Sequence, residues 1–164
     1  MFATPADVIV TALTAARKLL HRFVDDLKSH EFEHQPCDGA NCAAWILGHL
    51  ALTDRRILGW LGATALPPLP DGFEARFKPT RVKAEAQSGF GDPAELIALF
   101  DAHRDALLAL VPTVPAAKFG EAAPVVNPMF ATVGEAALFM ALHVSLHAGH
   151  LSIIRRSLGY PPVS

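Results

Sequence analysis

Residues 140–159 read MALHVSLHAGHLSIIRRSLG and place three histidines, His143, His147 and His150, in an apolar segment. An α-helix turns about 100° per residue, so positions i, i+4 and i+7 lie on one narrow stripe. Imidazole is the commonest protein ligand for divalent transition metals, and an i, i+4 pair can chelate one ion from a single helix. Imidazoles on the buried side of an apolar helix need hydrogen-bond partners or a metal. This stretch therefore predicts a core helix whose histidines meet one of those two needs.

These three histidines cannot form a metal site by themselves. His143 and His150 are seven residues apart, which is about 10 Å along a helix axis, whereas a zinc–nitrogen bond is only about 2.1 Å long. One adjacent pair can bind, either His143 with His147 or His147 with His150, and the spacing does not choose between them. We expect the third ligand to be His49, in the middle of another apolar segment. Such a set leaves a position open for water or substrate. The alternative is a group of core histidines bonded to carbonyls or water.

Composition excludes several classes of protein. The chain has 164 residues and a formal net charge of −2, which predicts one domain over residues 1–164 and argues against a basic nucleic-acid surface. The first ten residues lack the basic stretch and cleavage site of a secretory signal, and two cysteines are too few for a disulfide framework. We therefore expect a cytoplasmic protein. The apolar fraction of 51% indicates a deeply buried element or an oligomer, and we expect a homodimer.

The same C-terminal segment requires a comparison with membrane helices. Residues 136–154 carry no formal charge and are about long enough to span a bilayer. The segment also contains three histidines, and polar residues at membrane depth are costly. Because a buried helix is also apolar on all sides, we expect a central helix of a bundle and no membrane partner.

Four segments combine apolar residues at helical spacing with helix start signals. The start signals are residues that commonly cap helices: Thr4, Asn41, Asp92 and Thr132. Proline follows two of these caps, and a glutamate completes a capping box after the last two. The predicted helices cover residues 5–29, 41–62, 93–112 and 132–158.

The connection between the second and third helices, residues 63–91, is unusually long. Loops longer than about 12–15 residues are uncommon in compact domains and tend to be functional. We found no convincing strand or repeat. The pattern therefore predicts an all-α four-helix bundle with a long crossover loop between helices 2 and 3. We expect this loop to form a wall of a pocket at one end of the bundle.

Two motifs resemble the DinB/YfiT-like superfamily of metal-binding four-helix bundles. NCAAWILGHLALTDRRIL at residues 41–58 carries His49 midway along the second helix, and LHVSLHAGHLSIIRRSLG at residues 142–159 matches H-x-x-x-H-x-G-[QH] with His143, His147 and His150. LPDGFEARF at residues 69–77 also resembles the crossover loop of some members. The resemblance covers nearly the whole chain in helix order. It implies that His49, His143 and His147 bind zinc or nickel and that His150 is a pocket residue.

Other candidate residues have weaker signals. Arg56, at i+7 from His49, could hold an anionic substrate group; residues 54–56 more often form a solvated face or an interhelical pair. A reactive or metal-bound Cys42 is possible near a helix N-terminus, alongside Cys37, but a structural thiol is favoured. No general base stands beside the proposed metal. The remaining polar candidates are predicted to lie on the surface or in loops: His21, His30, His34, His103, Glu95 and Asp105.

Three functions follow from these observations. The resemblance implies a metal-dependent enzyme that activates a low-molecular-weight thiol or water for transfer to a small electrophilic substrate, as an S-transferase or hydrolase. The second hypothesis is a non-catalytic, stress-associated metal-binding protein in which the ion ties two helices together. The third is a helical interaction module with core histidines and no metal.

Overall fold

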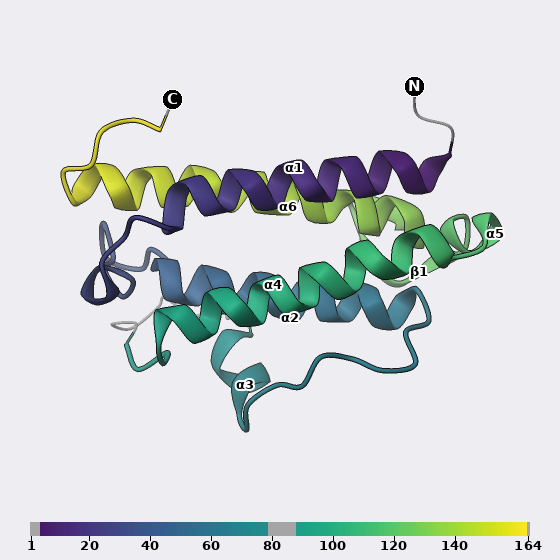
Figure 1. Ribbon diagram of the computed structural model, residues 1–164, viewed down its shortest axis with the longest axis horizontal. Helices are drawn as coiled ribbons and strands as arrows, with labels where there is room; N and C mark the ends of the chain where they lie inside the picture. The colour runs from purple at the N-terminus through teal and green to yellow at the C-terminus, as the bar shows by residue number, and fades with distance from the viewer. Residues whose placement is uncertain (1–3, 79–87, 164) are drawn as a thin grey trace.

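The computed structural model describes residues 4–78 and 88–163 and is mostly helical (Figure 1). Four long helices dominate it: α1 (Pro5–Val24), α2 (Ala43–Trp60), α4 (Pro93–Leu110) and α6 (Val133–Ser157). The short elements are η1 (Ser29–Glu31), α3 (Phe73–Phe77), η2 (Val111–Thr113), α5 (Ala116–Phe119), β1 (Ala122–Asn127) and β2 (Phe130–Thr132). In space, α1 packs lengthwise on α6 and α2 packs on α4. α2 also contacts α6.

The predicted capping residues are the N-caps of three of the four long helices. The Thr4 side chain accepts a hydrogen bond from the Asp7 amide, and Thr132 does the same for Glu135, each within a complete capping box. Asp92 caps α4 through the Ala94 amide, without the capping box that was predicted with Glu95. Each cap satisfies a backbone donor that the first turn of a helix leaves unpaired, so the starts of α1, α4 and α6 are confirmed.

The second helix begins later than predicted. Cys42, not Asn41, is the N-cap of α2, and its side chain makes no capping hydrogen bond. Instead, the Ala44 amide donates to the carbonyl oxygen of Phe32 at 2.9 Å. A distant backbone carbonyl thus satisfies the donor that a local side chain was expected to satisfy. The first helix also ends early, at Val24 and not near residue 29.

The expectation of no strands was wrong. β1 and β2 form a short antiparallel pair ahead of α6, and the Met129 amide donates to the Asn127 side chain in the turn between them. Both strands are short and β1 is largely exposed, so neither has the alternating pattern that marks a half-buried strand. Phe130 packs against the rings of Trp60 and Phe139. Phe130 therefore links the hairpin to both α2 and α6.

The long connection contains a short helix that lies against α2. An ideal Cβ at Gly48 would come within 2.3 Å of the Phe77 ring, so only glycine permits this approach. Phe73 and Phe90 pack on the same Phe77 ring. This contact fixes the C-terminal end of α3 beside the middle of α2. Residues 79–87 of the expected connection lie outside the described residues.

α6 is the one helix in the described part of the chain that is long and apolar enough to cross a membrane. Its most apolar window has a mean hydropathy of 1.5, and 44% of that window is buried inside the protein. A helix that packs within a protein core shows the same length and composition. Here α6 packs against α1 and α2.

A buried ion pair joins three of the long helices. Arg104 on α4 donates to both carboxylate oxygens of Asp54 on α2, at 2.7 and 3.0 Å, and to the Leu13 carbonyl of α1 at 3.3 Å. The side chains of Arg104 and Asp54 are 0% and 1% exposed. Residues 54–56 were expected to form a solvated face or an interhelical pair. Asp54 forms an interhelical pair.

Removing one member of this pair should be far worse than removing both. Arg104→Met leaves the Asp54 carboxylate buried without its partner and should lower the free energy of unfolding by about 3–5 kcal/mol. In the double variant Asp54→Leu/Arg104→Met no buried charge is left, and most of that loss should be recovered. Urea denaturation of the three proteins measures the difference. A double variant no more stable than Arg104→Met would contradict this account of the pair.

Candidate metal centre

Three histidines from two helices converge at one point. The Nε2 atom of His143 on α6 lies 3.3 Å from Nε2 of His49 on α2 and 3.1 Å from Nε2 of His147 on α6. One ligand atom from each of the three residues lies within 4.8 Å of the others. His49 and His147 are each 7% exposed. The structure thus brings together the three residues that the family resemblance selects.

Aromatic rings support two of these imidazoles. Trp45, one turn before His49 on α2, stacks on the His49 ring with centroids 4.6 Å apart and an interplanar angle of 10°. Phe139, one turn before His143 on α6, is nearly parallel to the His143 ring at 6.0 Å. Residues four apart lie on the same helix face, so each helix supplies both the imidazole and the ring beside it. These contacts restrict the imidazole orientations before any ligand binds.

The environment keeps all three imidazoles neutral at pH 7. Burial lowers the pKa of His49 to about 4; the Phe77 backbone opposes this shift, and the charge of Arg56 adds to it. Burial, followed by the neighbouring His49 and Arg104, lowers the pKa of His143 to about 4. Burial and the nearby His143 and His49 lower the pKa of His147 to about 3. Histidine binds a metal ion as the neutral imidazole. These three rings are already neutral, so a metal ion need not displace a proton from them.

The geometry fits a divalent ion. Nitrogen atoms that bind one tetrahedral zinc ion at about 2.1 Å are about 3.4 Å from each other, close to the 3.3 and 3.1 Å separations of the Nε2 atoms. The Nε2 atoms are the nitrogens that face one another, and an unprotonated imidazole nitrogen offers its lone pair to a metal ion. Three neutral rings that turn the same nitrogen toward a common point are therefore arranged for a cation.

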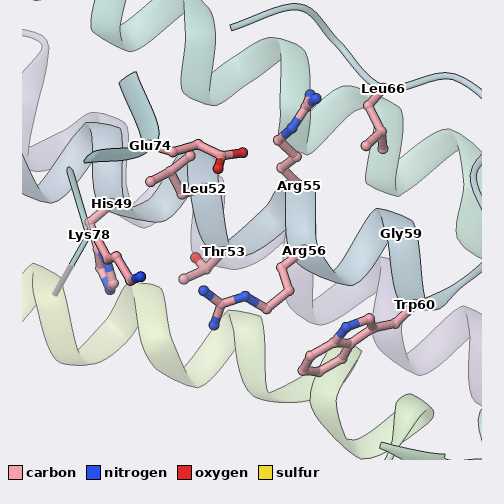
Figure 2. A pocket seen from close by; sticks show the side chains of 10 residues that line it. All are labelled: His49, Leu52, Thr53, Arg55, Arg56, Gly59, Trp60, Leu66, Glu74 and Lys78. Atoms are coloured by element: carbon pink, nitrogen blue, oxygen red, sulfur yellow. The ribbon is translucent and has the colours of Figure 1, made fainter. Parts of the chain in front are cut away.

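A cavity of about 460 Å³ opens beside His49 (Figure 2). α2 supplies most of its wall, and the connection supplies Leu66, Glu74 and Lys78. Figure 2 shows Arg56 turned back along α2 toward Thr53, while Arg55 points to the other side. Volumes of 300–1,000 Å³ are usual for small-molecule sites.

A smaller space of about 190 Å³ continues from this cavity toward α6. It shares His49, Thr53, Arg56 and Trp60 with the larger cavity and reaches His143. A molecule in this region would thus contact two of the three clustered histidines. The connection lines the larger cavity, as expected of a pocket wall, but supplies no described residue to the smaller space.

The third histidine of the C-terminal motif, His150, lies outside that region. His150 is exposed, and its ring centroid is 5.4 Å from that of His147. It lines a different cavity of about 250 Å³ together with Cys37 and Asn41. The structure therefore places His150 beside a member of the cluster but not in the cavity that His49 lines.

Two histidines expected on the surface or in loops lie on long helices and are partly or fully buried. His103 is 0% exposed, and its Nδ1 atom lies 2.8 Å from the Leu99 carbonyl oxygen. Its neighbours Leu99, Phe100 and Leu107 at helical spacing are the signal that indicated burial. His21 is half-buried between Asp25 and Asp101. The surface assignment was thus wrong for His103.

The cysteines do not join the histidine cluster. Cys42 is fully buried, and burial raises the pKa of its thiol. A raised pKa lowers the thiolate fraction and so disfavours a reactive thiol, which agrees with a structural role. Cys37 is exposed.

The sequence analysis missed the charged residues that the connection contributes. Glu74 and Lys78 line the cavity beside His49, although neither is near any histidine in the sequence. Their position depends on the packing of Phe77 over Gly48. The resemblance of residues 69–77 to a crossover loop was the one signal that pointed to this segment.

Comparison with known proteins identifies a family. A model of the DinB superfamily matches residues 12–151. No curated protein and no solved structure matches the chain. The matched range includes all three clustered histidines and the two helices that carry them.

The depressed pKa values predict a pH dependence of the metal-free protein. The ordinary pKa of histidine is 6.5, and the folded-state pKa of His49 is about 4. At a pH between these values the imidazole is protonated in the unfolded chain but not in the folded chain, so the free energy of unfolding should fall as the pH falls. Each ring should contribute roughly 1.4 kcal/mol per pH unit across that window. Urea denaturation with chelator, from about pH 7 to 4.5, measures this slope. A triple variant with leucine at positions 49, 143 and 147 should lose it, and an equal slope in both proteins would refute the assignment.

Proposed function

This chain belongs to the DinB superfamily, and from that premise we propose that it is a metal-dependent enzyme that joins a low-molecular-weight thiol to a small electrophile. The convergence of the His49, His143 and His147 Nε2 atoms beside a cavity supports the proposal best. Neutral nitrogen ligands suit either zinc or nickel. We further interpret the four long helices as a DinB-type bundle, with the α2–α4 connection as its crossover.

The three histidines would hold the ion, and the chain restricts their movement. Trp45 stacks on His49, and helix geometry fixes the spacing of His143 and His147. When bound, a divalent ion supplies a Lewis acid that lowers the pKa of a thiol or of water and so provides a nucleophile near neutral pH. The burial that keeps the imidazoles neutral also excludes bulk water from this point.

Charges around the cavity favour an anionic electrophile. Among the described residues, Arg55, Arg56 and Lys78 line it together with one carboxylate, that of Glu74. Arg55 already donates to the Pro67 carbonyl, whereas Arg56 extends along the cavity toward Thr53 (Figure 2). We therefore assign Arg56 to a carboxylate or similar group of the substrate. The remaining wall, which includes Leu52, Trp60 and Leu66, suits an apolar body.

Glu74 completes the set of groups that the reaction needs. In the proposed reaction the thiol loses its proton, a sulfur–carbon bond forms, and the electrophile either releases a leaving group or takes up the proton. The Glu74 carboxylate lines the same cavity as His49, and a carboxylate oxygen can accept or return a proton.

A structural ion is the second candidate function. The histidine cluster joins α2 to α6, and an ion that binds only the folded state stabilises it by mass action. The cavity beside His49 distinguishes the two functions, because a purely structural site has a closed coordination sphere. The reaction experiment below separates them.

Metal-loaded protein should accelerate the reaction of glutathione with chlorodinitrobenzoate, which releases chloride and forms a coloured thioether. We expect at least a tenfold higher rate than for the chelated protein, and we expect His147→Ala to abolish the difference because it removes a ligand. His30→Ala, which removes an exposed histidine outside the cluster, should leave the rate unchanged. Equal rates for the two forms, when elemental analysis finds the ion in the metal-loaded protein and none in the chelated protein, would indicate the structural function.

The same assay tests the role of Arg56. With the uncharged analogue chlorodinitrobenzene as second substrate, Arg56→Gln should raise KM for the benzoate several-fold and leave KM for the neutral compound unchanged. Metal content should stay at the wild-type level. An equal effect on both substrates would remove Arg56 from substrate binding.

A further inference from the structure

The outward face of α6 is apolar along almost its entire length. Leu138, Leu142, Leu146 and Ile153 are 37%, 57%, 58% and 58% exposed. At about 100° per residue they lie within about 40° of one line along the helix. Gly149 is exposed on the same line. No described residue of this chain covers these side chains enough to bury them.

The other long helices in the described part of the chain do not expose such a face. The exposed residues of α1 include Asp7, Lys18 and Arg22, and those of α4 include Glu95 and Asp105. On α6, residues 136–154 carry no formal charge, and exposed charges flank them only at the two ends, as Glu135 and Arg156. Isolated exposed leucines are ordinary, whereas a continuous apolar stripe marks an interaction surface.

We propose that this stripe binds the same stripe of a second copy of the chain, with the two α6 helices antiparallel. A two-fold axis between Ser145 and Leu146 makes the contact self-complementary, as an isologous interface requires. In that register Leu138 faces the second copy's Ile153, and Leu142 faces its Gly149. Glu135 faces the second copy's Arg156, so each end pairs opposite charges. Parallel packing would place like charges together.

Gly149 supports this register. Glycine is unfavourable in the interior of a helix, yet an ideal Cβ at Gly149 would meet nothing within 4 Å in the described chain. Packing inside the chain therefore does not require glycine at this position. A missing side chain opposite Leu142 leaves space for that leucine, and small residues let two helices approach closely.

The proposed contact leaves the metal centre accessible. His143 and His147 lie about 100° or more around α6 from the centre of the stripe and contact His49 of α2. The cavity beside His49 is walled by α2 and the connection. A second copy on the stripe would not fill that cavity, so this inference does not depend on the proposed function.

Sedimentation velocity at micromolar concentration tests the surface. We expect a wild-type dimer, and we expect Leu142→Glu and Leu146→Glu to raise its dissociation constant at least tenfold. Ala98→Glu, which adds the same charge at an exposed position of α4, should remain dimeric. Helical circular dichroism and metal content should be equal in all four proteins, because the substituted side chains are exposed. A monomeric wild type, or a dimer insensitive to both leucine substitutions, would overturn the proposal.

Cysteine crosslinking tests the register in a Cys37→Ser background, which removes the exposed native thiol. Leu146→Cys, beside the two-fold axis, should crosslink to its own copy on mild oxidation. Leu142→Cys should crosslink only when mixed with Gly149→Cys, because seven residues separate it by about 10 Å from its own copy. A homotypic Leu142→Cys crosslink would indicate parallel packing and contradict the register.

The other occupant of an apolar stripe is a lipid surface, and one variant separates the two. Gly149→Leu makes the stripe more apolar and fills the space opposite Leu142. If the stripe binds a second copy, this substitution should raise the dissociation constant of the dimer at least tenfold. If the stripe binds lipid, the substitution would instead increase binding to neutral phosphatidylcholine vesicles. Wild-type protein that floats with such vesicles and sediments as a monomer without them would assign the stripe to lipid and overturn the proposal.

Discussion

Three neutral imidazoles from two helices share one buried point, and this convergence is the constraint on which the account of the molecule depends. Burial lowers all three pKa values and keeps the lone pairs free. The Nε2 separations of 3.3 and 3.1 Å match those around a single small cation. α6 supplies two of the nitrogens through its own periodicity, but the third requires α2 to lie against it in one register.

Other contacts hold α2 in that register. The Asp54–Arg104 pair ties α2 to α4 one to two turns beyond His49. Phe77 packs where Gly48 leaves space, directly beside His49 in the sequence. This second contact also positions the connection that carries Glu74 and Lys78 to the cavity. Packing on the outer side of α2 thus shapes the wall of the cavity as well as the helix that carries the ligand.

Much of this arrangement could be predicted from local sequence signals. Capping residues gave the starts of α1, α4 and α6, and the i, i+4 spacing together with the family resemblance gave His143 and His147. Signals that depend on distant residues were missed. The start of α2 depends on the Phe32 carbonyl, and β1 is too exposed to show a strand pattern. His103 was assigned to the surface or a loop, although Leu99, Phe100 and Leu107 at helical spacing indicate burial.

Elemental analysis of protein expressed without a histidine tag tests the convergence most directly. The account predicts about one divalent ion per chain in the wild type and almost none in His49→Ala, because α6 alone offers only two of the three ligands. Wild-type protein that carries no metal, takes up none on addition of zinc or nickel, and melts at the same temperature with and without chelator would contradict it.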